Sequence, residues 1–129
     1  MKKIIFISIF VLLSSNIIMA QDFFNPNKGL EPKTFGDISK GDGYEVRLRF
    51  ESKPFESKTD IQLIYNGVPE LNGEAILRFL DKDGFEIKNT TVFVSTMCDV
   101  ENQNLTCRTD DNFIADNDYR KISSVSVSN

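Results

Sequence analysis

The residues most suited to chemistry in this chain are acidic side chains close to its C-terminal end. Four aspartates fall within a short tract that also holds two asparagines: Asp110, Asp111, Asp116 and Asp118, with Asn112 and Asn117. Clustered carboxylate and amide oxygens suit a calcium ion or a basic protein surface. The tract lacks the ligand spacing of a calcium loop, and it contains Phe113-Ile114, which we expect to reach the core. The pattern therefore favours a solvated acidic loop that contacts a partner, without a metal.

A second group of acids, Asp81 and Asp83, precedes Gly84. An EF-hand loop with Gly84 at its sixth position would place Phe79 first and Thr90 last, where the ion requires acidic ligands. Asp-Gly between two apolar, β-prone runs instead predicts a tight turn. We expect a β-hairpin over residues 75–94, and we expect the rest of the chain to be organised around it.

Histidine is absent from the whole chain. This removes the usual Ser-His-Asp and Cys-His arrangements, His-ligated zinc and the commonest general base near neutral pH. There is no glycine-rich phosphate loop and no nucleophile elbow. Ser-Lys and paired-carboxylate chemistries stay open, but no residue is singled out as catalytic. We predict a protein that is not an enzyme and that needs no cofactor.

Residues 1–20 have the pattern of a secretory signal. Lys2 and Lys3 precede an apolar run from Ile4 to Leu13, and Ala20 is a small residue at the expected cleavage point. We predict export to the periplasm or the extracellular medium, with cleavage near Ala20. Ile18 is bulky for the position three residues before the cut, so slipped cleavage or retention as an anchor are the alternatives. No second apolar segment follows, so no transmembrane segment is expected in the mature chain.

Export places the two cysteines, Cys98 and Cys107, in an oxidising compartment, where a disulfide is the default. Their spacing does not match CxxC redox chemistry, and two thiols without histidine do not make a zinc site. Without Lys2 and Lys3, 13 basic and 19 acidic residues leave a net charge of −6. An acidic domain repels phosphate backbones, so the expected partner is another envelope or extracellular protein and not a nucleic acid.

Strict alternation predicts one strand over residues 44–51, with its apolar residues on one face and its charged residues, Arg47 and Arg49 among them, on the other, and another strand over residues 60–66. Residues 21–43 are polar and turn-rich, and we interpret them as an N-terminal arm with one possible edge strand over residues 34–38. In that arm, Phe23 and Phe24 either pack on the domain or contact a partner. Residues 95–118 look irregular, and residues 119–127 are predicted to form a strand with a bulge near Ile122. The domain is therefore expected to span residues 44–129.

Six or seven short strands separated by turn residues, with no convincing amphipathic helix, indicate an all-β, antiparallel immunoglobulin-like sandwich. A small β-barrel is the alternative. The stretch Arg78-Phe79-Leu80-Asp81-Lys82-Asp83-Gly84 resembles the FxLYD type of small immunoglobulin-like domain in exported bacterial proteins, although the tyrosine of that motif is missing. The resemblance implies a fold more than a function.

These features favour an exported, non-catalytic binding module with an unknown ligand, working through loops or a sheet edge. The candidate contact residues are the four aspartates and the two arm phenylalanines named above. The alternative is an inhibitor or immunity-type protein whose acidic loop enters the basic cleft of an enzyme.

Overall fold

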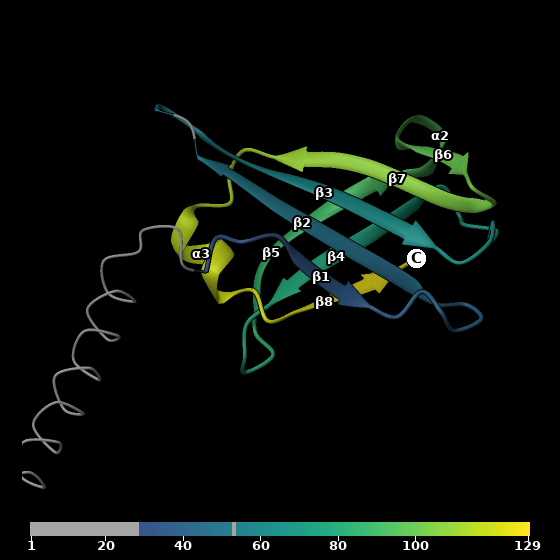
Figure 1. The fold of residues 1–129 in the computed structure, drawn as a ribbon, viewed down its shortest axis with the longest axis horizontal. Helices are drawn as coiled ribbons and strands as arrows, with labels where there is room; N and C mark the ends of the chain where they lie inside the picture. The colour runs from purple at the N-terminus through teal and green to yellow at the C-terminus, as the bar shows by residue number, and fades with distance from the viewer. Residues whose placement is uncertain (1–28, 53) are drawn as a thin grey trace, which may run out of the picture.

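The computed structural model describes residues 29–52 and 54–129. Phe23, Phe24 and the predicted signal segment lie outside these residues. The described part contains eight strands and two short helices (Figure 1), in this order: β1 Lys33–Gly36, β2 Tyr44–Ser52, β3 Ser57–Tyr65, β4 Glu74–Leu80, β5 Glu86–Phe93, α2 Val94–Met97, β6 Cys98–Glu101, β7 Asn104–Asp111, α3 Asp116–Lys121 and β8 Ser124–Ser128.

The strands form two antiparallel sheets. One has five strands in the order β1-β2-β3-β7-β6, and the other has three in the order β5-β4-β8. In Figure 1 the five-stranded sheet crosses in front of the three-stranded sheet. The strand pairing does not continue from one sheet to the other. The predicted antiparallel sandwich is therefore confirmed, and the alternative of a closed barrel is wrong.

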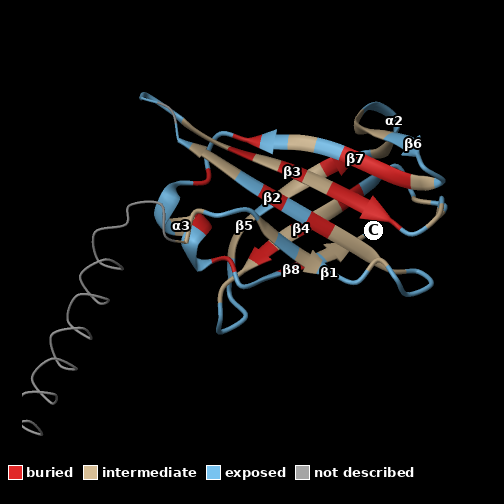
Figure 2. Cartoon of the chain, viewed as in Figure 1, coloured by how far each residue is buried: buried red, intermediate tan, exposed pale blue. Residues whose placement is uncertain are grey.

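The core lies between the sheets and follows the predicted alternation. On β2, Val46 and Leu48 are buried while Arg47 and Arg49 are exposed, because successive side chains point to opposite faces of a strand. The other strands supply Ile61, Leu63, Ala75, Leu77, Phe79, Val92, Leu105 and Val125 to the same core. In Figure 2 the buried positions alternate with more exposed ones along the strands of both sheets.

The predicted central hairpin is confirmed as β4 and β5, which pair from Glu74↔Phe93 to Leu80↔Glu86. Asp81 holds the turn, since its Oδ1 accepts hydrogen bonds from the backbone N–H groups of Asp83 at 2.9 Å and Phe85 at 3.0 Å. Gly84 has a φ of 85°, which glycine adopts without a steric cost. The carboxylate of Asp81 is thus used for the turn.

The predicted edge strand of the arm exists as β1, which pairs with β2 and forms one edge of the five-stranded sheet. Lys33 on β1 ties this edge to α3. Its Nζ donates hydrogen bonds to the carbonyls of Tyr119 at 2.7 Å and Ile122 at 3.0 Å. The carbonyl of Tyr119 also accepts the backbone N–H of Ile122 at 3.2 Å, and a cation beside the carbonyls at the C-terminal end of a helix is favourable. At least residues 33–36 of the predicted arm therefore belong to the sandwich.

The expectation of an irregular segment over residues 95–118 is wrong for much of its length, because β6 and β7 form a hairpin there. Asn102 and Gln103, at its apex, both have positive φ values of 51° and 68°. Such a two-residue turn matches the twist of the strands that it joins. Asn-Gln is a weaker turn signal than Asn-Gly, and the short β6 carries few apolar residues, so local patterns hardly indicate this hairpin.

The strand predicted over residues 119–127 is wrong in its first part. Residues Asp116–Lys121 form α3, and the strand β8 begins only at Ser124. Tyr119 and Ile122 are both buried and three residues apart. This is the spacing of one helical face, and it also imitates a strand with a bulge when only the sequence is considered.

The predicted disulfide between Cys98 and Cys107 is present, and the two residues are directly paired across β6 and β7. It links an edge strand of four residues to its only neighbour in the sheet. The bond therefore holds the short β6 in the five-stranded sheet.

Candidate functional site: an arginine groove on the sheet face

The outer face of the five-stranded sheet carries a hollow of about 410 Å³. Three arginines from two strands line it, Arg47 and Arg49 from β2 and Arg108 from β7. Gln62 of β3 lies among them, and Pro32 and Thr34 close the side nearest β1. We call this hollow the arginine groove.

Strand register brings these residues together. Arg47 is paired with Gln62, and Gln62 is paired in turn with Arg108. Because neighbouring strands are about 4.8 Å apart, the backbones of the two arginines are separated by about 10 Å. Arg49 occupies the next outward position on β2, so the three arginines and Gln62 lie on the same face of the sheet.

Carboxylates at the rim hold two of the guanidinium groups. Arg108 meets Glu101 of β6 through two hydrogen bonds of 2.7 and 2.8 Å, and Arg47 meets Glu45 of its own strand at 3.2 and 3.3 Å. The hydrogen bonds from Arg108 lower the pKa of Glu101 and raise that of Arg108. Both arginines keep more than half of their side-chain surface exposed.

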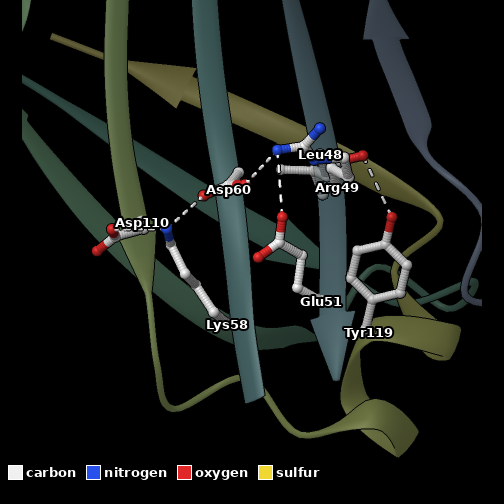
Figure 3. Close-up of polar contacts among 7 residues, drawn as sticks. All are labelled: Leu48, Arg49, Glu51, Lys58, Asp60, Asp110 and Tyr119. Carbon is white, nitrogen blue, oxygen red and sulfur yellow. Dashed lines mark hydrogen bonds and ion pairs between the residues drawn. The ribbon is translucent and has the colours of Figure 1, made fainter. Parts of the chain in front are cut away.

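The third guanidinium belongs to a ladder of ion pairs (Figure 3). Nη2 of Arg49 lies 3.0 Å from Asp60 and 3.2 Å from Glu51, while Nζ of Lys58 lies 3.2 Å from Asp60 and 3.7 Å from Asp110. Partial burial raises the pKa of Asp60, but hydrogen bonds from Arg49 and Lys58 outweigh this and lower it. The same hydrogen bonds raise the pKa values of Arg49 and Lys58. Asp60 is therefore a fixed negative charge between two cations.

The side chains of the arginine groove suit the binding of a charged ligand. Arginine offers five N–H donors in a planar fork that matches a carboxylate, and two such forks, on strands whose backbones are about 10 Å apart, suit a ligand with two acidic groups. The amide of Gln62 between them both donates and accepts hydrogen bonds. The groove thus has the chemistry to recognise an acidic ligand.

The structure separates the four aspartates predicted to form one acidic loop. Asp110 and Asp111 end β7, whereas Asp116 and Asp118 lie in the first turn of α3. Asp111 is only 8% exposed, accepts a hydrogen bond from the N–H of Phe113 at 2.7 Å and lies 3.9 Å from Nζ of Lys88. Asp110 joins the ladder of ion pairs, and Asp116 is exposed. Their roles as partner contacts stay predictions.

Local sequence patterns indicate only part of the arginine groove. The alternating charges on residues 44–51 marked Arg47 and Arg49 as lying on one outer face. Arg108 lies 59 positions beyond Arg49 in a segment interpreted as irregular, so no local pattern could place it beside them. The position of β7 next to β3 had to be known first.

No family model matches the chain, and no curated protein or solved structure matches it. The resemblance to FxLYD-type domains therefore stays a prediction. None of the helices within residues 29–52 and 54–129 is long and apolar enough to cross a bilayer. In the same ranges, no three carboxylate or thiol side chains are grouped so that they could hold a metal ion.

Proposed function

We propose that this chain is an exported, non-catalytic binding module that recognises another envelope or extracellular protein. The arginine groove is the contact surface, and an acidic segment of the partner is the ligand. The observation that carries the proposal is the convergence of Arg47, Arg49 and Arg108 beside one hollow.

The arginine groove stands out against the composition of the chain. The chain contains five arginines and has a net charge of −4, yet three of the five line this one hollow. Exposed ion pairs contribute little to folding stability, so the sandwich does not depend on these side chains. The rim carboxylates Glu45 and Glu101 orient the guanidinium groups, and an acidic ligand competes with them for the remaining N–H donors.

The proposal that the module is exported rests on the sequence of residues 1–20, and the disulfide is compatible with it. Cys98 and Cys107 are bonded, and disulfides persist in oxidising compartments. The N-terminal sequence of the protein recovered from the envelope or the medium tests this part of the proposal. A start near Gln21 supports it, and recovery of the chain in the cytoplasm with Met1 intact contradicts it.

The binding experiment is an affinity capture from envelope extract at low and high salt, with the partner identified by mass spectrometry. The test variant carries Arg47→Gln and Arg108→Gln. The matched control is Arg78→Gln, because Arg78 is also part-exposed and paired with a carboxylate, Glu86, but lies on the other sheet. We expect the control to retain the partner and the double variant to lose it.

Salt dependence provides a second readout. Contacts between exposed charges are screened at high ionic strength, so capture should weaken as salt rises. Capture that is unaffected by both salt and the double substitution would show that the partner binds elsewhere.

An inhibitor or immunity-type protein is the second candidate function, and one observation favours it. Phe113 is 82% exposed between the exposed Asp110 and Asp116, so it offers an apolar anchor with an acidic surround. Such a surface suits a pocket in a basic cleft. Loss of capture in Phe113→Ala with Asp116→Asn, while the arginine double variant still binds, would favour this candidate over the arginine groove.

A further inference from the structure

Within residues 29–52 and 54–129 the two sheets have four edge strands, β1 and β6 in the five-stranded sheet and β5 and β8 in the three-stranded sheet. The outer side of an edge strand presents backbone N–H and C=O groups that lack a neighbouring strand, so it can pair with a strand of another chain. Proteins prevent such pairing with very short strands, prolines, irregular pairing or charged side chains. The four edges of this sandwich differ in these features.

Both edges of the five-stranded sheet are protected. β1 has four residues, follows Pro32 and carries the charged Lys33 on its inner face, opposite the buried Leu48. β6 also has four residues, and two of them, Asp99 and Glu101, are charged. A second chain would therefore meet a short strand and a charge at either edge.

The β5 edge of the three-stranded sheet is protected as well. Lys88 lies opposite the buried Phe79, so a cation occupies the inner face of this edge. The pairing of β5 with β4 also shifts register between Phe79 and Leu80. An inward charge and an irregular ladder both disfavour the addition of a further strand.

The strand β8 has none of these protecting features. It spans Ser124–Ser128 with the sequence Ser-Val-Ser-Val-Ser, which contains no charge and no proline, and it pairs with β4 in one continuous register. In the part of the chain that the structure describes, β4 is its only neighbour in the sheet. Val127, opposite the buried Leu77, is only part-buried. Figure 1 shows β8 along the lower margin of the sandwich.

The sequence of β8 indicates which strand fits this edge. Ser-Val-Ser-Val-Ser reads the same in both directions, so two copies aligned antiparallel about Ser126 pair serine with serine and valine with valine. Ser124 then lies opposite Ser128, and Val125 lies opposite Val127. Hydroxyl pairs across strands are favourable, β-branched valines suit a sheet, and no charge meets its own copy.

We propose that β8 pairs with β8 of a second copy of this chain, in an antiparallel, two-fold symmetric dimer. A two-fold interface requires a surface that is complementary to itself, and the palindromic strand meets this condition. The register about Ser126 pairs inward residues with inward residues, so Val125 and Val127 stay on the core side. The two three-stranded sheets thereby join into one continuous sheet.

This dimer would present two arginine grooves together. The two-fold axis is perpendicular to the joined sheet, so both five-stranded sheets lie on the same side of it, with their outer faces pointing the same way. A contact between two five-residue strands is small, so we expect a weak dimer that forms at high protein concentration. The inference does not depend on the ligand of the arginine groove.

Sedimentation equilibrium tests the dimer with Ser126→Lys and Ser126→Glu. Two-fold pairing places position 126 opposite itself, and like charges directly opposite are destabilising. Asn89→Lys is the matched control, because Asn89 on β5 and Ser126 on β8 are both exposed and both pair with Arg78, from opposite sides of β4. We expect the control to dimerise like the unmodified protein and each variant at position 126 to raise the Kd about fivefold.

An equimolar mixture of Ser126→Lys and Ser126→Glu tests the register. Opposite charges then face each other at the centre of the paired strands, so we expect the mixture to dimerise at least as tightly as the unmodified protein. Ser126 is exposed, so all variants should unfold near the temperature of the unmodified protein. Arg47→Gln with Arg108→Gln should leave the dimer unchanged, which separates this inference from the function proposed above.

Three results would overturn the inference. The first is an unmodified protein that stays monomeric at about 1 mM, including the case in which Ser126→Lys abolishes capture of an envelope protein, which would assign the edge to a strand of that protein. The second is a dimer that Ser126→Lys and Asn89→Lys affect equally. The third is a mixture of the two charged variants that dimerises no better than either variant alone.

Discussion

The hydroxyl of Tyr119 should control the stability of the sandwich at alkaline pH. Tyr119 is completely buried, and its hydroxyl donates a hydrogen bond to the carbonyl of Glu31 at 2.8 Å, with the carbonyl of Leu48 at 3.3 Å. Figure 3 shows the second of these contacts. The phenol thereby links α3 to β2 and to the residues before β1. Replacing it by phenylalanine keeps the ring in the core and removes only the hydrogen bond.

The size of the expected stability change follows from the hydrogen bond of the Tyr119 hydroxyl and from the pKa of Tyr119. Loss of one buried hydrogen bond should lower the free energy of unfolding by about 1–1.5 kcal/mol at pH 8. Burial and the nearby carboxylate of Glu31 raise the pKa of Tyr119 from 10.0 to about 12. A folded-state pKa above the unfolded value means that this stability is complete below pH 10 and is lost between pH 10 and 12. The free energy of unfolding should therefore fall by about 1.4 kcal/mol at pH 11 and by about 2.7 kcal/mol above pH 12.

The assay is urea unfolding, followed by circular dichroism, at steps from pH 8 to pH 11.5. We expect Tyr119→Phe to be less stable than the unmodified protein at pH 8 and nearly equal to it by pH 11. Tyr44→Phe, at the other end of β2, is the matched control. Because burial also raises the pKa of Tyr65, the ionisation of Tyr119 is taken from the difference in absorbance at 295 nm between the unmodified protein and Tyr119→Phe. If the unmodified protein and Tyr119→Phe lose stability in parallel up to pH 11.5, the assigned role of the phenol is wrong.

Three further substitutions test separate features of the fold by thermal and denaturant unfolding. Thr59→Val should stabilise the protein by about 1 kcal/mol, because Oγ1 of Thr59 is buried with no hydrogen-bond partner in the described residues. An unchanged or lower unfolding midpoint would imply that this oxygen has a hydrogen-bond partner. Gln103→Gly should add about 0.5 kcal/mol, since Gln103 has a φ of 68° that glycine adopts more readily, whereas a loss of stability would argue against this turn. Cys98→Ser with Cys107→Ser should cost about 2.7 kcal/mol through the chain entropy of a ten-residue loop, and reduction of the unmodified protein should reproduce that cost.

Local sequence patterns were sufficient to predict most of the strands. The alternation over residues 44–51 placed Val46 and Leu48 inside and the two arginines outside, because a strand repeats every two residues wherever it lies in a fold. Asp83-Gly84 likewise located the central turn from local chemistry alone. The disulfide followed from the compartment and from the presence of only two cysteines.

Local patterns failed where a short element depends on its surroundings. Residues 116–121 form too few turns to be stable as an isolated helix, and the buried ring of Tyr119 together with the ammonium of Lys33 supports α3 only in the assembled sandwich. The hairpin of β6 and β7 is similar, since it is stabilised by its disulfide and by pairing of β7 with β3. Neither contact can be deduced from a window of neighbouring residues.

Strand periodicity, the central turn, the acidic balance and the lack of histidine follow from the sequence alone, because these depend on residue type and local spacing. The surfaces of the molecule depend on the tertiary packing. Arg47, Gln62 and Arg108 lie side by side because β2, β3 and β7 are neighbours. Residues far apart in the chain become neighbours only through the packing of the whole core, so no local pattern encodes the arginine groove.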